Sequence, residues 1–179
     1  MAIRTFSWAQ AAKFNLAVLC GLVAGCAREN PFFIEVNECP GVAIVENTGA
    51  LTVFSGLGRD QDDISYRATL SQLSRSCKED EELGVENEVT FSIVARKGPA
   101  AISDFITIPY FVVVSRGAED IIAKRVNEVE IDFAGRQVAG VRETLRQNFP
   151  DLEALKANEY EVLVGFQLDN DQAIYNLLQ

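Results

Sequence analysis

The chain has 179 residues, of which 16 are basic and 26 are acidic, and its formal net charge is −10. This surplus of negative charge argues against nucleic acid as a partner, because an acidic surface repels the phosphate backbone. The sequence contains no histidine, which excludes a Ser-His-Asp or Cys-His mechanism, a histidine-ligated zinc or haem, and a histidine pH switch.

The first 25 residues have the features of a secretory signal peptide. Arg4 and Lys13 supply positive charge, no acidic residue precedes Glu29, and the stretch from 14 to 25 is almost wholly apolar. A helix of this length reaches about 18 Å, well short of the roughly 30 Å of hydrocarbon in a bilayer. We therefore expect residues 1–25 to be a cleaved signal peptide and not a permanent transmembrane helix.

The residues that close this stretch, Val23-Ala24-Gly25-Cys26, resemble the lipobox of bacterial lipoproteins. The resemblance implies cleavage between Gly25 and Cys26, diacylglycerol on the Cys26 sulfur, and acylation of the new amino group. Two or more acyl chains anchor a protein stably, whereas one chain is marginal. Ala27 follows the cysteine where inner-membrane lipoproteins often carry Asp, so the resemblance favours the periplasmic face of the outer membrane. An ordinary signal peptide with a chance cysteine is the alternative.

We expect three segments along the chain. They are the signal peptide at 1–25, the lipidated cysteine with a short tether at 26–38, and one β-rich domain at 39–179. The third segment has the size of an ordinary single domain. The sequence thus predicts one folded domain that is held at a membrane through the lipid on Cys26.

The four cysteines separate by position. Cys20 leaves with the signal peptide and Cys26 takes the lipid, so Cys39 and Cys77 remain in the folded domain. In the oxidising periplasm a disulfide between them is the favoured interpretation. Two free thiols or a redox pair are the alternatives, although the CxxC spacing typical of a redox pair is absent.

The domain begins with short strands. Apolar runs at 42–45 and 51–54 flank the turn sequence Asn47-Thr48-Gly49, which predicts two strands joined by a turn.

An acidic loop follows these strands. Asp60, Asp62 and Asp63 lie close together beside glycines, and a calcium site needs several such oxygen ligands. The spacing does not match an EF-hand, because Ile64 stands near the position that requires glycine and no glutamate closes the loop. A solvated acidic turn is therefore the preferred interpretation, and the three aspartates are weak candidates for a metal site. No other metal and no cofactor is expected.

Residues 64–71 alternate between apolar and polar side chains, which predicts a half-buried strand. Leu73 and Cys77 continue the apolar positions but fall on odd numbers, out of phase with the alternation. We therefore expect the register to shift by one residue, as at a bulge, near Ser71 or Gln72.

Two further strands are predicted before residue 115. Residues 89–95 alternate with the apolar side chains at odd positions, and the turn Lys97-Gly98-Pro99 ends that strand. Residues 105–114 are apolar on both faces. Pro109 cannot donate a ladder hydrogen bond, so we expect it at a bulge or a sheet edge.

The last third of the chain contains one ambiguous segment. Residues 129–133 and 160–168 alternate clearly and predict strands, whereas 137–157 fits both strand and helix spacing. Asp169 and Gln172 form a capping-box pair that predicts a terminal helix. One face of this helix would carry Ala173, Ile174, Leu177 and Leu178.

About seven short strands with one disulfide predict a mainly β fold, an antiparallel immunoglobulin-like or fibronectin-like β-sandwich with a short C-terminal helix. A helix-capped barrel is the second choice. The chain resembles a group of uncharacterised lipoproteins from alphaproteobacterial envelopes. The resemblance rests on Cys39-Pro40-Gly41-Val42, Leu51-Thr52-Val53-Phe54, Gly58-Arg59-Asp60, Cys77, Ile108-Pro109-Tyr110-Phe111-Val112 and 160–168. This resemblance covers nearly the whole mature domain and implies no activity.

The preferred function is a non-catalytic interaction or envelope-organisation module whose partners are the membrane, through Cys26, and envelope proteins. A small-ligand or calcium-binding protein is the first alternative. A carboxylate-dependent hydrolase is the second, although some pair of the 26 acidic residues would reach the required separation by chance. No phosphate-binding glycine loop, GxSxG or HExxH is present. An exposed apolar patch or open strand edge would favour the interaction module, and a deep pocket with converging polar groups would favour its rivals.

Overall fold

A computed structural model describes residues 39–80, 84–117, 120–149 and 154–179. The predicted signal peptide, Cys26 and the tether lie outside these residues. The described residues belong to one compact unit. Among the described residues, no helix has the length and apolar character needed to cross a bilayer.

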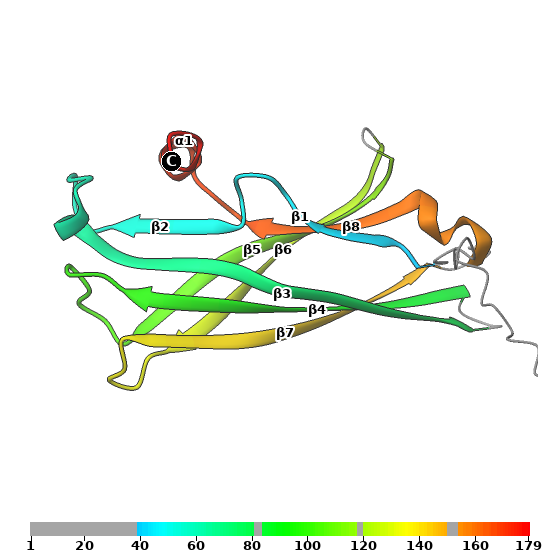
Figure 1. The fold of residues 1–179 in the computed structure, drawn as a ribbon, viewed down its shortest axis with the longest axis horizontal. Coiled ribbons are helices and arrows are strands. Elements are labelled where there is room, and N and C mark those ends of the chain that lie inside the picture. The colour runs from blue at the N-terminus through cyan, green and yellow to red at the C-terminus, as the bar shows by residue number, and fades with distance from the viewer. Residues whose placement is uncertain (1–38, 81–83, 118–119, 150–153) are drawn as a thin grey trace, which may run out of the picture. The chain divides into compact units, whose positions relative to one another are not determined.

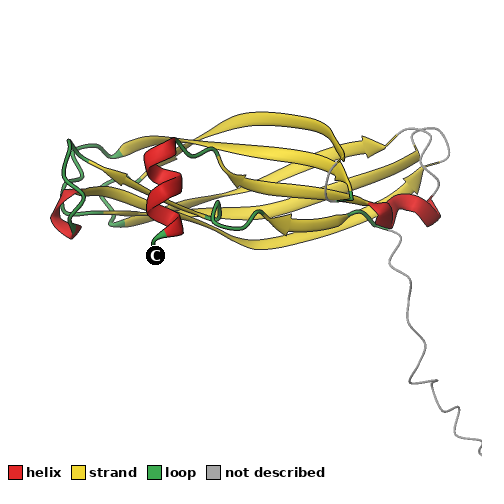
Figure 2. Ribbon diagram, turned by 90° about the horizontal axis from the view of Figure 1, so that it is seen from above, coloured by secondary structure: helices red, strands yellow, loops and turns green. Residues whose placement is uncertain are grey.

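The domain is a β-sandwich of two four-stranded sheets, which confirms the predicted mainly β fold (Figures 1 and 2). One sheet has the order β1 (Gly41–Ile44), β8 (Tyr160–Phe166), β5 (Phe105–Arg116) and β6 (Asp120–Asp132). The other has the order β2 (Ala50–Phe54), β3 (Ile64–Asp80), β4 (Gly84–Lys97) and β7 (Val138–Phe149). Neighbouring strands are antiparallel except for β1, which runs parallel to β8. The finer immunoglobulin-like or fibronectin-like subtype stays a prediction.

The core lies between the two sheets, and the alternation of the sequence accounts for it. The predicted inward-facing residues of β4 are fully buried, namely Val89, Phe91, Ile93 and Ala95. On the opposite sheet, Val162, Val164 and Phe166 of β8 are equally buried. Because successive side chains of a strand point to opposite faces, every second residue meets the other sheet.

The register of β3 shifts where the phase of its sequence changes. The pairing of β3 with β4 is interrupted between Ser71 and Ser74. Gln72 adopts a positive φ of 54° at this point, a conformation that L-residues rarely take. The shift returns Leu73 and Cys77 to the core side, where both are partly buried against the core. The predicted irregularity near Ser71 or Gln72 is confirmed.

Cys39 and Cys77 form the predicted disulfide, with their Cα atoms 5.8 Å apart. The bridge joins Cys39, two residues before β1, to the second half of β3. Nearby, Arg75 donates a hydrogen bond of 2.6 Å from its Nη1 to the carbonyl oxygen of Pro40. The start of the domain is thus fixed to β3 by a covalent bond and a hydrogen bond.

The prediction that Pro109 lies at a bulge or a sheet edge is wrong, because Pro109 lies on the interior strand β5 and pairs regularly with Glu128. The only register shift between β5 and β6 is at Val114 and Ser115. Pairing of β5 with β8 reaches only from Arg116 to Tyr110, and beyond it Gln167 donates to the carbonyl oxygen of Pro109 at 3.0 Å. In a strand, the backbone N and C=O of one residue point to the same side. The nitrogen of Pro109, which has no hydrogen to donate, therefore points to the β8 side, beyond the last residue of β8, where no ladder hydrogen bond is lost.

The ambiguous segment 137–157 contains strand β7 and the start of a 3-10 helix, Ala154–Glu159. The C-terminal helix α1 (Asn170–Leu177) forms with the predicted capping box. Gln172 donates its backbone N–H to the Asp169 carboxylate at 2.8 Å, and its side chain accepts from the Asp169 backbone at 3.0 Å.

Candidate functional site

The aspartates of the predicted acidic loop are used to build a turn. Residues Gln61–Asp63 form a single turn of 3-10 helix. The backbone N–H of Asp60 donates to the Asp63 carboxylate at 3.0 Å, while Asp60 and Asp62 are exposed. In the described parts of the chain, no group of three or more Cys, Asp or Glu side chains is arranged to hold a metal ion. The acidic run from Glu79 to Glu82 lies partly outside those parts.

A buried tyrosine and a carboxylate meet between the two sheets. The Tyr110 hydroxyl on β5 donates to the Glu143 carboxylate on β7 at 3.0 Å. The Tyr110 ring also packs edge to face against Phe91, with 5.5 Å between the ring centroids. Tyr110 is 2% exposed, and burial followed by the hydrogen bond and charge of Glu143 raises the pKa of its phenol. The contact joins β5 of one sheet to β7 of the other.

This raised pKa predicts a loss of stability at high pH. The unfolded chain ionises Tyr110 near pH 10, whereas the folded chain keeps the proton, so the free energy of unfolding should fall as the pH rises above about 10. Tyr110→Phe should reduce the difference in urea midpoint between pH 8 and pH 11. A residual decrease is expected from Tyr66, whose pKa burial also raises. An equal pH dependence in the variant and the parent protein would contradict this assignment.

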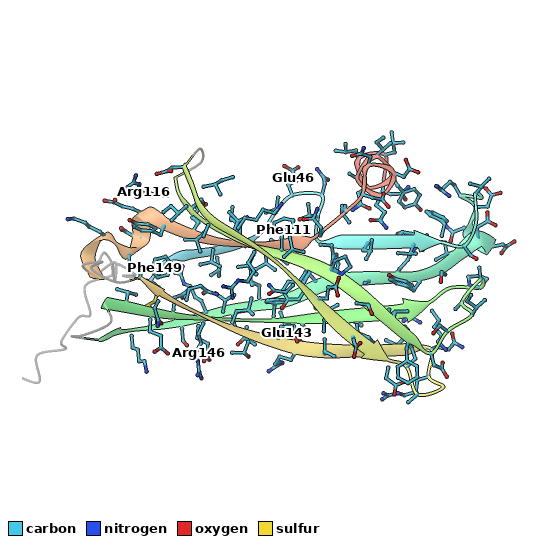
Figure 3. All side chains as sticks on the ribbon, turned by 180° about the vertical axis from the view of Figure 1, so that it is seen from behind. Glu46, Phe111, Arg116, Glu143, Arg146 and Phe149 are labelled. Carbon is cyan, nitrogen blue, oxygen red and sulfur yellow. A yellow bond between two sulfur atoms is a disulfide. The ribbon has the colours of Figure 1, made fainter. Side chains whose placement is uncertain are left out.

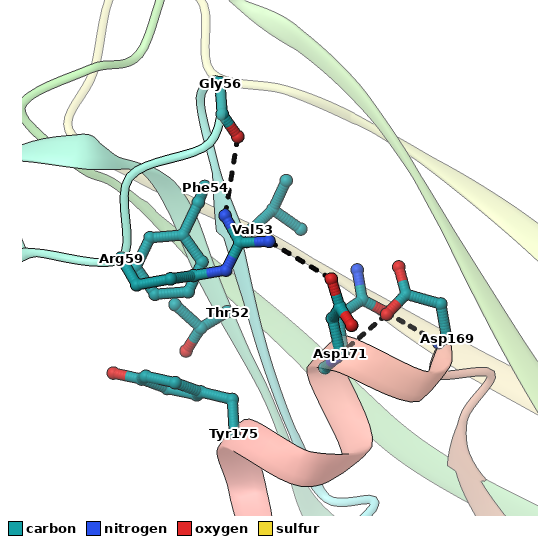
Figure 4. A pocket seen from close by; sticks show the side chains of 9 residues that line it. Thr52, Val53, Phe54, Gly56, Arg59, Asp169, Asp171 and Tyr175 are labelled. Carbon is teal, nitrogen blue, oxygen red and sulfur yellow. Dashed lines mark hydrogen bonds and ion pairs between the residues drawn. The ribbon is translucent and has the colours of Figure 1, made fainter.

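Polar groups converge in a hollow between β2 and α1, but they serve to attach the helix (Figure 4). Arg59 lies over the Phe54 ring at 5.3 Å and forms an ion pair with Asp171 at 3.2 Å. Phe54 packs edge to face against Tyr175, with 5.1 Å between centroids. The hollow measures about 170 Å³, below the roughly 300–1,000 Å³ of typical ligand sites. We interpret it as the seam of helix packing.

The amide of Asn176 completes the attachment of α1. Its Nδ2 donates at 2.8 Å to the carbonyl oxygens of both Asn47 and Ala50. Together with Tyr175 and Asp171, this contact places the polar and aromatic side of α1 against β2.

The apolar face of α1 therefore points away from the sandwich. Ile174, Leu177 and Leu178 are 56%, 67% and 78% exposed, respectively. Residues three and four apart share one face of a helix, so the three side chains form a continuous apolar strip. Single exposed apolar residues are ordinary, whereas a contiguous patch marks an interaction surface. The sequence predicts this face but gives no sign that it is directed outward.

A second surface lies where strands β6 and β7, the edges of the two sheets, separate. The two strands meet near the turn that connects them and diverge along their length (Figure 3). Between them opens a cleft of about 390 Å³, lined by residues of β5, β6 and β7. Its lining combines core side chains with Lys124, Arg125 and Arg146.

Comparison with known proteins provides no identification. The chain matches no protein family model, no curated protein and no solved structure.

Proposed function

We propose that this chain is a lipoprotein of the outer membrane, anchored at Cys26, whose β-sandwich is a non-catalytic interaction module on the periplasmic side. The proposed anchor is supported by the lipobox sequence and by the charge, length and small residues of the segment before it. Membership in the alphaproteobacterial lipoprotein group that the sequence resembles is part of the same proposal.

The lipid anchor predicts a labelling result. Cells grown with radioactive palmitate should incorporate label into the parent protein and none into Cys26→Ala, because the thioether forms on the Cys26 sulfur. Cys20→Ala is the matched control, since Cys20 precedes the cleavage point and should not affect labelling. An unlabelled parent protein, or full labelling of Cys26→Ala, would refute the anchor.

The exposed apolar face of α1 is the observation that carries the interaction module. Burial of apolar surface contributes about 25 cal/mol per Å², so three large side chains left in water are a cost that a bound partner would remove. Their position is fixed by the contacts of Tyr175 and Asn176 with β2. A surface that is both apolar and rigid loses little entropy when it binds a protein. We propose that an envelope protein covers Ile174, Leu177 and Leu178.

Photocrosslinking in intact cells tests this surface. A photoreactive residue at Leu177 should capture a specific envelope protein, which detergent pull-down and mass spectrometry then identify. The matched control is Leu57, a 97% exposed apolar residue in a loop, which should capture none. The substitutions Ile174→Ser and Leu178→Ser should lower the yield of crosslinked partner at position 177. If position 177 captures no specific protein, or the same proteins as position 57, the interaction surface is not at α1.

A further inference from the structure

The cleft between β6 and β7 has an apolar floor. Val112 and Val114 of β5 and Leu145 of β7 line it. Val112 is 8% exposed, and Val114 and Leu145 pack against the core from its edge. The edge of the core is therefore partly exposed on this side, and the cleft volume of about 390 Å³ lies within the range of small-molecule sites.

The inner face of β6 changes character along the strand. Val129 and Ile131 face the core and are buried. By the alternation of the strand, Asn127, Arg125 and Ala123 share this inward phase, and all three line the cleft. Polar and small side chains thus occupy positions that large apolar residues would fill in a closed sandwich.

The charge of the cleft is opposite to that of the chain. The formal net charge of the protein is −10, yet the residues that line this space include Lys124, Arg125 and Arg146 and no acidic residue. Arg146 and Lys124 have the outward phase of their strands, where Arg146 is ion-paired with Glu88 at 3.0 Å and Lys124 lies 5.0 Å above the Phe111 ring. Arg125, which pairs with Val112, is therefore the cation that faces the cleft. Within the described part of the chain, Arg125 has no ion-pair partner.

We propose that this cleft binds an anionic amphiphile, whose acyl chain lies on Val112, Val114 and Leu145 and whose negative head group pairs with Arg125. An unpaired guanidinium beside an apolar floor matches a molecule that carries an anion at one end of a hydrocarbon chain. A fatty-acid carboxylate and a phospholipid phosphate share this chemistry. The site is separate from the α1 surface and does not depend on the proposed interaction there.

The test uses the full-length protein in isolated envelope membranes. The probe is dodecanoic acid that carries a diazirine and a terminal alkyne, and labelled peptides are located by mass spectrometry after irradiation. Labelling should fall on β5, β6 and β7 and should be displaced by excess unlabelled dodecanoate. Arg125→Glu should lower labelling about tenfold by removing the head-group pair. Ala123→Trp should lower it as strongly by filling the cleft.

Controls separate this result from nonspecific labelling and from misfolding. Arg96→Glu, an exposed charge reversal on β4, should leave labelling unchanged, and non-reducing gels should show the disulfide intact in every variant. An alkylammonium probe of equal chain length should label at least tenfold less. The proposal is overturned if either cleft variant retains full labelling, or if the two probes label equally. A lysophosphatidylglycerol probe in a parallel arm shows whether phospholipid or free fatty acid supplies the anion.

Discussion

Replacing Phe91 by alanine should lower the free energy of unfolding by about 3–5 kcal/mol, which is the usual cost of emptying a buried phenylalanine site. Phe91 is fully buried on β4, and its ring packs edge to face on Tyr110 of the opposite sheet. The substitution removes apolar burial and leaves a cavity between the sheets. Since single domains are stable by roughly 5–15 kcal/mol, this one change would remove a large part of the total.

Phe105→Ala is the matched control for Phe91→Ala. Phe105 also lies on a strand, the first residue of β5, but it is 69% exposed. Its replacement should change the free energy of unfolding by less than about 1 kcal/mol. Urea denaturation of both variants with the disulfide intact measures the difference. Losses of equal size would mean that Phe91 is not in the centre of the core.

Removal of the disulfide should have the second large effect. The bridge between Cys39 and Cys77 spans a sequence separation of 38 residues. In the chain-entropy description, closing a loop of this length stabilises a protein by about 4 kcal/mol, because the unfolded chain has fewer conformations. The double variant Cys39→Ala with Cys77→Ala should therefore unfold at a clearly lower urea concentration than the parent.

Reduction provides the internal control for this experiment. A thiol reductant should shift the urea midpoint of the parent protein toward that of the double variant and should leave the double variant itself unchanged. Alkylation without reductant, followed by mass spectrometry, should find Cys39 and Cys77 of the parent protein unalkylated, because their sulfur atoms are joined in the disulfide. Alkylation of both cysteines would contradict the bridge itself. A urea midpoint of the parent protein that does not change with reductant would contradict its stabilising role.

The strands could be predicted from sequence wherever one face of the sheet is buried. Residues 89–95 and 129–133 alternate between apolar and polar side chains because every second side chain enters the core. This two-residue period can be recognised from each segment alone. Residues 137–157 lack such a mark, since Val141 and Leu145 suit both a strand and a helix. The pairing of β7 with β4 decides the outcome, and that partner lies about 50 residues away, beyond the reach of any local pattern.

The surfaces were harder to predict for a related reason. The sequence of α1 gives an apolar face, but the direction of that face is set by the contacts of Tyr175 and Asn176 with β2. A signal for the cleft was present, because Arg125 and Asn127 continue the inward phase of Val129. Its meaning depends on the separation of β6 from β7, which only the folded chain defines.

The parallel pair of β1 and β8 constrains the order in which this domain can assemble. Gly41 and Ile44 pair with Glu161 and Val164. Strand β1 therefore has no partner in its sheet until the chain as far as β8 is available to fold. Contacts between such distant residues are slow to form, because a long loop must close first. Strands β2, β3 and β4 pair with their neighbours in sequence, so only short loops must close for this part of the sheet to form. The Cys39–Cys77 bridge can therefore close on an early hairpin and hold β1 beside it until β8 arrives.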